Sequence, residues 1–183
     1  VQHGDLFWDA VSEQTIGRVL DTVDADALRR QQANSDRTRR SKVPDTTKYI
    51  LWTKRAERMA DIVSRRYADG VPDYLGCGVS VENQETADKR LPHLMRLNGH
   101  RFVMIEPMLG PIDLGGYEQV SWVVCGSETG SDRARKMDLE WARSLRDFSV
   151  LHGIPFFIKQ LGNDHLQPQR ELDGRTWDEF CPA

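Results

Sequence analysis

Short apolar runs recur along the chain, and each is bounded by glycine, proline or polar residues. Runs of this length that are rich in β-branched and aromatic residues are typical of strands. They do not alternate between apolar and polar positions, which predicts strands covered on both faces, as in a parallel sheet flanked by helices. The predicted strands span 49–52, 74–81, 101–105, 120–125 and 154–158.

Between these runs, apolar residues return every three or four positions, which predicts amphipathic helices. The predicted helices contain the apolar positions 16–27, 59–67, 87–95 and 141–152. Ser12, Asn83 and Asp138 are suited to cap three of them. Pro92 is expected to kink or divide the third helix, because proline has no backbone N–H to donate.

The alternation of strands and helices predicts an α/β protein of right-handed βαβ units around a parallel sheet. One body is predicted over 1–162, with a polar basic insertion at about 29–47. Segment 107–119 is rich in proline and glycine and is expected to be a loop. Residues 163–183 are expected to form a C-terminal tail that packs on the body.

The composition fits a globular chain of one domain. It has 183 residues, of which 39% are hydrophobic and 29% charged. This length excludes a complete (β/α)8 barrel, which needs about 250 residues. The balance of 25 basic and 28 acidic residues gives no overall attraction to nucleic acid or to an anionic membrane.

The sequence offers no membrane or export signal, so a cytoplasmic location is expected. No apolar stretch approaches the length of a transmembrane helix, and no basic region precedes an apolar run at the N-terminus. The three cysteines are scattered and odd in number, which favours a reducing compartment.

Segment 29–42 stands out because it holds six basic residues and one acidic residue. Such a segment could contact phosphate backbones, or it could be a solvated connection between a helix and a strand. It contains no aromatic residue, which weakens a role in stacking on single-stranded bases.

Charged residues follow the predicted strands, at the edge where ligands bind in parallel α/β folds. Glutamates there could ligate a metal or form an acid–base pair, and the basic residues could hold phosphate or carboxylate. A lysine and a glutamate at this edge could instead simply neutralise each other. The candidate catalytic residues are Glu82, Glu106, Glu128 and Lys159, and the candidate ligand-binding residues are Asp5, Lys54, Arg55, Ser80, Asn83, Ser127 and Gln160.

Several long motifs occur in a characteristic order: GDLFW at 4–8, LWTKRAERM at 51–59, GVSVENQ at 78–84 and EPMLGPIDL at 106–114. Further motifs lie at 126–130, 141–147, 155–160 and 172–180. With these motifs the chain resembles a bacteriophage-associated family of unknown function. That family is similar to radical-SAM enzymes, which implies a partial TIM-type barrel and a three-cysteine motif near its start.

The resemblance implies a [4Fe–4S] cluster and S-adenosylmethionine for the family. Cys77, Cys125 and Cys181 fall at none of the motif positions, and the chain begins at what looks like the family's second strand. Because a cluster needs thiolate ligands, we expect no cluster and no radical chemistry from this polypeptide alone. The exposed edge of such an open barrel is expected to be covered by a second copy, by the polar segment or by the tail.

Three functions remain open on the sequence. The first is a phage or mobile-element protein that binds a small molecule at the carboxyl ends of its strands, without catalysis. The second is a metal-assisted hydrolase or lyase that uses the glutamates and lysines. The third is a nucleic-acid or protein-binding module that uses segment 29–42. No membrane partner is expected for any of them.

Overall fold

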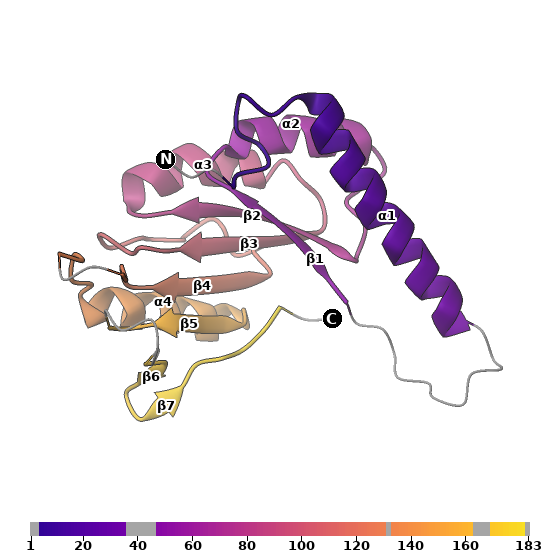
Figure 1. Ribbon diagram of the computed structural model, residues 1–183. Coiled ribbons are helices and arrows are strands. Elements are labelled where there is room, and N and C mark those ends of the chain that lie inside the picture. The colour runs from indigo at the N-terminus through magenta and orange to yellow at the C-terminus, as the bar shows by residue number, and fades with distance from the viewer. Residues whose placement is uncertain (1–3, 36–46, 131–132, 163–168, 182–183) are drawn as a thin grey trace.

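The computed structural model describes residues 4–35, 47–130, 133–162 and 169–181. They form a five-stranded parallel sheet with the order β1-β2-β3-β4-β5, four helices and a separate two-stranded sheet (Figure 1). The elements are α1 (Glu13–Ser35), β1 (Tyr49–Thr53), α2 (Ala56–Arg66), β2 (Leu75–Val81), α3 (Gln84–Leu94), β3 (His100–Ile105), β4 (Trp122–Gly126), α4 (Leu139–His152), β5 (Phe156–Gln160), β6 (Glu171–Leu172) and β7 (Arg175–Thr176).

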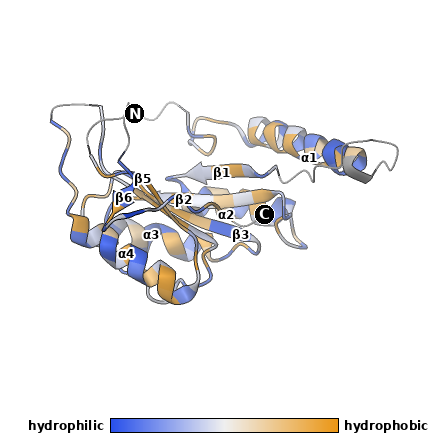
Figure 2. Ribbon diagram, turned by 90° about the horizontal axis from the view of Figure 1, so that it is seen from below, coloured by the Kyte–Doolittle hydropathy of each residue, from blue (hydrophilic) through white to orange (hydrophobic). Residues whose placement is uncertain are grey.

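The predicted α/β architecture with a parallel sheet is confirmed. Neighbouring strands of the sheet are also neighbours in sequence, so crossovers of one hand place their helices on one face. Figure 2 shows α2, α3 and α4 below the sheet, and α1 beside β1. The main core fills the space between the sheet and these helices, and it contains Met59, Leu91 and Leu145 of the helices together with Val79 and Val103 of the strands.

The opposite face of the sheet, here called the open face, carries no helix within the described residues. A second, smaller apolar cluster lies on it, and its buried members are Phe102, Met104, Trp122, Val124 and Phe157. The strands are therefore apolar on both faces although helices cover only one. The side chains of β3, β4 and β5 bury one another on the open face.

The C-terminal tail closes one edge of the sheet. The N–H of Ile158 donates to the carbonyl of Trp177 at 2.9 Å, and the N–H of Glu179 donates to that of Phe156 at 3.2 Å. Trp177 joins the main core, whereas Phe180 stacks on the open face against Phe157. The tail therefore covers the outer edge of β5, while β1 at the other end has β2 as its one strand partner among the described residues.

Helix α1 is longer than its apolar pattern indicates. The predicted basic insertion begins at residue 29, but the helix continues to Ser35. Arginine and glutamine at 29–32 are good helix formers, so the helix extends without further burial. Arg29 and Arg30 both pair with Asp26, at 2.7 and 2.6 Å. The rest of the basic segment, 36–42, lies outside the described residues.

Some smaller expectations were wrong. Pro92 does not divide α3, which continues to Leu94. Strands β4 and β5 begin at Trp122 and Phe156, each two residues later than predicted. Pro155 has no N–H to donate, and its carbonyl accepts from the N–H of Val123 in β4. In the described part of the chain, no helix is both long and apolar enough to span a membrane.

Candidate functional site at the carboxyl edge of the sheet

Four of the predicted charged residues gather at the carboxyl edge of the sheet. Side chains alternate between the two faces of a strand, so residues two positions apart share a face. Glu106 follows Met104 by two positions, and Lys159 follows Phe157 by two, which places both on the open-face side of this edge. Lys54 and Glu82 occupy the corresponding positions after β1 and β2.

Lys54 and Glu82 form an ion pair between the ends of β1 and β2. Arg90 of α3 adds a second cation, with its guanidinium 2.8 Å from the Glu82 carboxylate. Burial raises the pKa of Glu82, but the hydrogen bond from Lys54 and the charge of Arg90 outweigh it and hold the pKa below its ordinary value. The two cations and one carboxylate leave this group with a net positive charge.

Glu106 and Lys159 form the second pair. The Lys159 ammonium lies 2.8 Å from both oxygens of the Glu106 carboxylate. The buried Gln160 amide donates to the same carboxylate at 2.8 Å and to the carbonyl of Ser127 at 2.7 Å, which fixes the orientation of Glu106. The peptide bond between Glu106 and Pro107 is cis. The Lys159 side chain is 48% exposed.

Glu128 belongs to a different ion pair, with Arg135 at 2.7 Å. Hydrogen bonds from the Arg135 side chain and backbone lower the pKa of Glu128 to about 2. Each of the three predicted glutamates therefore has its own cation. Across the described ranges, no group of three His, Cys, Asp or Glu side chains is placed to hold a metal ion.

The Asp5 side chain is only 5% exposed, and its carboxylate is held by several hydrogen bonds. Its carboxylate accepts hydrogen bonds from the Phe7 N–H at 2.9 Å and the Thr53 hydroxyl at 2.7 Å. It also accepts from the Lys54 N–H at 3.3 Å and the Arg55 guanidinium at 3.1 Å. These contacts fasten the N-terminal segment to the end of β1.

The remaining predicted polar residues have local roles. Asn83 caps α3 in a reciprocal capping box with Thr86. The buried Ser127 hydroxyl donates to the carbonyl of Gly162 at 2.7 Å. Ser80 is buried in β2, in line with Gly76 and Gly78.

A cavity of about 310 Å³, here called the basic cavity, adjoins Lys54 on the helix side. It is lined by Asp9, Lys54, Arg55, Ala56, Glu57, Arg58, Lys89, Arg90 and His93. The first turn of α2 forms part of this wall, and Arg55 caps that helix without a side-chain hydrogen bond. Backbone N–H groups at such a helix start favour anions.

Arg58 is the cation of this cavity that lacks a carboxylate partner within the described ranges. Its guanidinium donates to the carbonyls of Phe7 at 3.3 Å, Trp8 at 2.5 Å and Val11 at 2.6 Å. Sequence reasoning missed Arg58, and it missed the basic residues of α3 at 89, 90 and 93. Their spacing on a predicted helix was the available signal, because positions three and four apart share a face.

The cysteines do not fit an iron–sulfur cluster. Cys77 and Cys125 lie in β2 and β4, buried in the main core, whereas Cys181 packs against the open-face cluster. Burial raises the pKa of the first two thiols to about 12, which disfavours the thiolate form that binds iron. The described cysteines therefore form no common ligand set.

Comparison with known proteins gives one match. A family model described as "Protein of unknown function (DUF5131)" matches residues 1–181. No curated protein and no solved structure matches the chain.

Proposed function

The chain belongs to the DUF5131 family of proteins of unknown function, and we propose that it binds a small organic anion at the carboxyl edge of its sheet. The ligand class is a carboxylate or a phosphate ester. The basic cavity carries this proposal, because five cationic side chains and one histidine line it against only two acidic ones.

Lys89 and Arg58 are the cations of the basic cavity that are most available to a ligand. Lys89 pairs with Glu85 at 2.6 Å on an exposed helix face, and such a pair contributes only about 0–1 kcal/mol, so an incoming anion competes for Lys89 at little cost. Lys54 and Arg90 share Glu82, whose side chain is only 13% exposed, so that cluster is not an exposed pair of this kind. A guanidinium has five N–H groups, and the three carbonyl contacts of Arg58 leave donors for a ligand.

The position of the cavity agrees with the general behaviour of parallel α/β folds. Ligands bind beyond the carboxyl ends of the strands, where the following helix begins. The sequential strand order is also that of a segment of a βα barrel, so we propose an open barrel-type arrangement. The association with bacteriophages and with radical-SAM enzymes rests on the sequence motifs alone.

Calorimetric titration with inorganic phosphate and with citrate, at constant ionic strength, tests the anion site. We expect saturable binding that weakens about tenfold when Lys89→Met and His93→Gln remove two wall residues that anchor no other segment. Lys136→Met, which changes an exposed lysine outside the cavity, serves as the matched control. Equal affinity in the double variant and the control, or no binding of either anion, would overturn the proposal.

A further inference from the structure

We propose that the outer edge of β1 binds an extended segment of a partner protein as an added β-strand. The preferred segment has two apolar residues two positions apart. An acidic residue lies two positions before the first of them and another lies two positions after the second, so that all four side chains point to the same face of the added strand. This inference does not rest on the anion site, although Lys54 lines both cavities.

The two edges of the sheet are treated differently. Residues 177–179 hydrogen-bond to the outer edge of β5, but β1 has no outer strand partner among the described residues. An uncovered strand presents a row of unpaired N–H and C=O groups, which is a template for another strand. The sheet is therefore open to extension along β1 as far as Trp52, beyond which the Lys54 N–H donates to Asp5 at 3.3 Å.

The backbone shows which groups are available. The N–H of Tyr49 donates to the carbonyl of Tyr74, so the backbone N–H and C=O groups of Tyr49, Leu51 and Thr53 point toward β2. In a parallel ladder the intervening residues face the other way. Ile50 and Trp52 therefore present their N–H and C=O groups at the outer edge.

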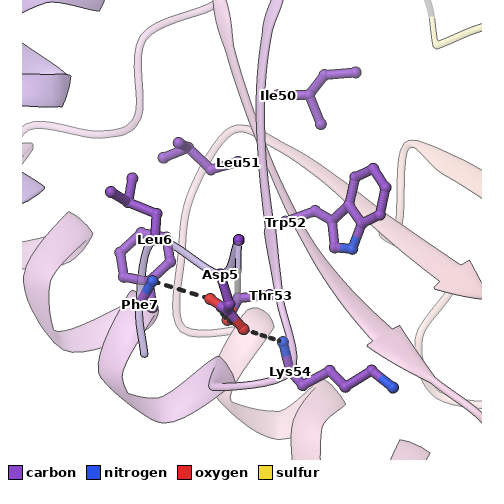
Figure 3. Close-up of a pocket in the computed structure, with 9 residues that line it drawn as sticks. Asp5, Leu6, Phe7, Ile50, Leu51, Trp52, Thr53 and Lys54 are labelled. Carbon is purple, nitrogen blue, oxygen red and sulfur yellow. Dashed lines mark hydrogen bonds between the residues drawn. The ribbon is translucent and has the colours of Figure 1, made fainter. Parts of the chain in front are cut away.

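A cavity of about 490 Å³, here called the edge groove, follows this edge. Gly4–Phe7 form one wall and the consecutive residues Ile50–Lys54 form the other. Since alternate side chains of a strand point to opposite faces, a cavity that touches five consecutive residues lies against the edge itself. Figure 3 shows Ile50 and Trp52 on one side of the strand and Leu51 on the other, toward Leu6 and Phe7.

The side chains beside the groove specify the partner. Ile50 and Trp52 are each 48% exposed on the open-face side, where an added strand would cover them. Lys48 lies two positions before Ile50 and Lys54 lies two positions after Trp52, so both lysines belong to the same face of the strand as these two side chains. Lys48 contacts only the Asp73 carbonyl and the ring of His100, so its charge has no carboxylate partner in the described ranges. An acidic residue in the partner complements Lys48, and a second one would share Lys54 with Glu82.

A second copy of this chain fits the same edge less well. Two copies of β1 paired antiparallel about Leu51 would place Lys48 of one copy opposite Lys54 of the other, because both lie three residues from the centre. Like charges directly opposite each other destabilise a strand pair. The charge pattern therefore favours a different, acidic strand.

The test uses the acetylated and amidated peptide Glu-Thr-Val-Thr-Val-Thr-Glu and follows binding to the full chain by tryptophan fluorescence and calorimetry. We expect saturable binding, and binding at least about tenfold weaker for the peptide with lysine in place of both glutamates. Ile50→Pro removes an outward N–H without breaking the ladder to β2 and should weaken binding about tenfold, whereas Ile50→Val should change it less than about threefold.

Two further measurements keep the proposal falsifiable. If Ile50→Pro unfolds, the unaltered protein is titrated with a peptide N-methylated at its valines and with one methylated at its central threonine. The N–H groups of the valines and of the central threonine point to opposite edges of the bound peptide, and only one of these edges faces β1. The two peptides should therefore differ about tenfold in affinity. Failure of the unmodified peptide to bind, or equal affinity for both methylated peptides, would overturn the proposal. So would sedimentation of the wild type as a dimer that Ile50→Pro or Trp52→Glu dissociates, because a second copy would then occupy the edge.

Discussion

Gly78 of β2 lies beneath the ring of Phe102 on the neighbouring strand β3, where the two residues are paired in register. A Cβ atom at Gly78 would come within 2.3 Å of the Phe102 ring. The ring therefore occupies the space that any other residue at position 78 needs. The packing of Phe102 on the open face therefore requires a residue without a side chain at position 78.

Replacement of Gly78 by alanine should destabilise the protein by about 1–3 kcal/mol, because Phe102 must move in a packed cluster. Gly76→Ala is the matched control, since its Cβ would meet Phe102 at an ordinary 3.7 Å. Urea denaturation of the two variants measures the difference. Equal unfolding free energies would show that Phe102 yields without cost.

Asp24 joins α1 to the body by accepting hydrogen bonds from Tyr67 at 2.8 Å and Tyr74 at 2.9 Å. Burial raises the pKa of Asp24, but these bonds and that from Arg66 outweigh it and hold the pKa below 3.8. The carboxylate is thus favoured in the folded state. Its stabilisation is fully present above the unfolded-state pKa near 3.9 and is lost as the pH falls through the lower folded-state pKa.

Asp24→Asn should therefore lower the unfolding free energy at neutral pH by about 1–2 kcal/mol and reduce its decline in acid. Asp21→Asn is the control, because Asp21 is 66% exposed and contacts Arg66 without reaching the tyrosines. Urea denaturation between about pH 2 and about pH 7 measures both variants. An acid decline as steep in Asp24→Asn as in the wild type would contradict this assignment.

The two aromatic residues of the tail should differ in their contribution to stability. Trp177 is buried against Phe156, and Trp177→Ala should cost about 3–5 kcal/mol. Phe180 stacks on Trp122 but is 69% exposed, so Phe180→Ala should cost less than about 1 kcal/mol and change the environment of the Trp122 indole. Guanidinium denaturation and tryptophan emission measure both effects. Similar costs would mean that the tail is not anchored mainly through Trp177.

The three thiols should react with iodoacetamide in a fixed order. Cys77 and Cys125 are buried and their pKa values are raised to about 12, by burial and, at Cys125, also by the charge of Glu106. Cys181 is partly exposed, although burial raises its pKa as well. Peptide mass spectrometry of the native protein near pH 8 should find label only at Cys181. Rapid labelling of Cys77 or Cys125 would show that the sheet opens.

The local features of the fold were predictable because they depend on residues close together in the sequence. The mostly apolar run at 74–81 predicted a buried strand, which the structure has at Leu75–Val81. Asn83 and Asp138 cap the helices that were expected after them. The order of elements predicted the parallel sheet, and the parallel sheet placed Glu106 and Lys159 at one edge. Periodicity and capping act over a few residues, so a single sequence carries them.

The tertiary structure alone decided which charged groups meet and which edge remains uncovered. Asp5 is anchored by Thr53 and Arg55, 48 and 50 residues away, whereas Glu128 turns to Arg135 seven residues on. Both kinds of carboxylate look alike in the sequence. The tail could have covered either end of the sheet, and the burial of Trp177 beside Phe156 fixes it at β5. Such pairings depend on distances set by the packed core, which no local pattern encodes.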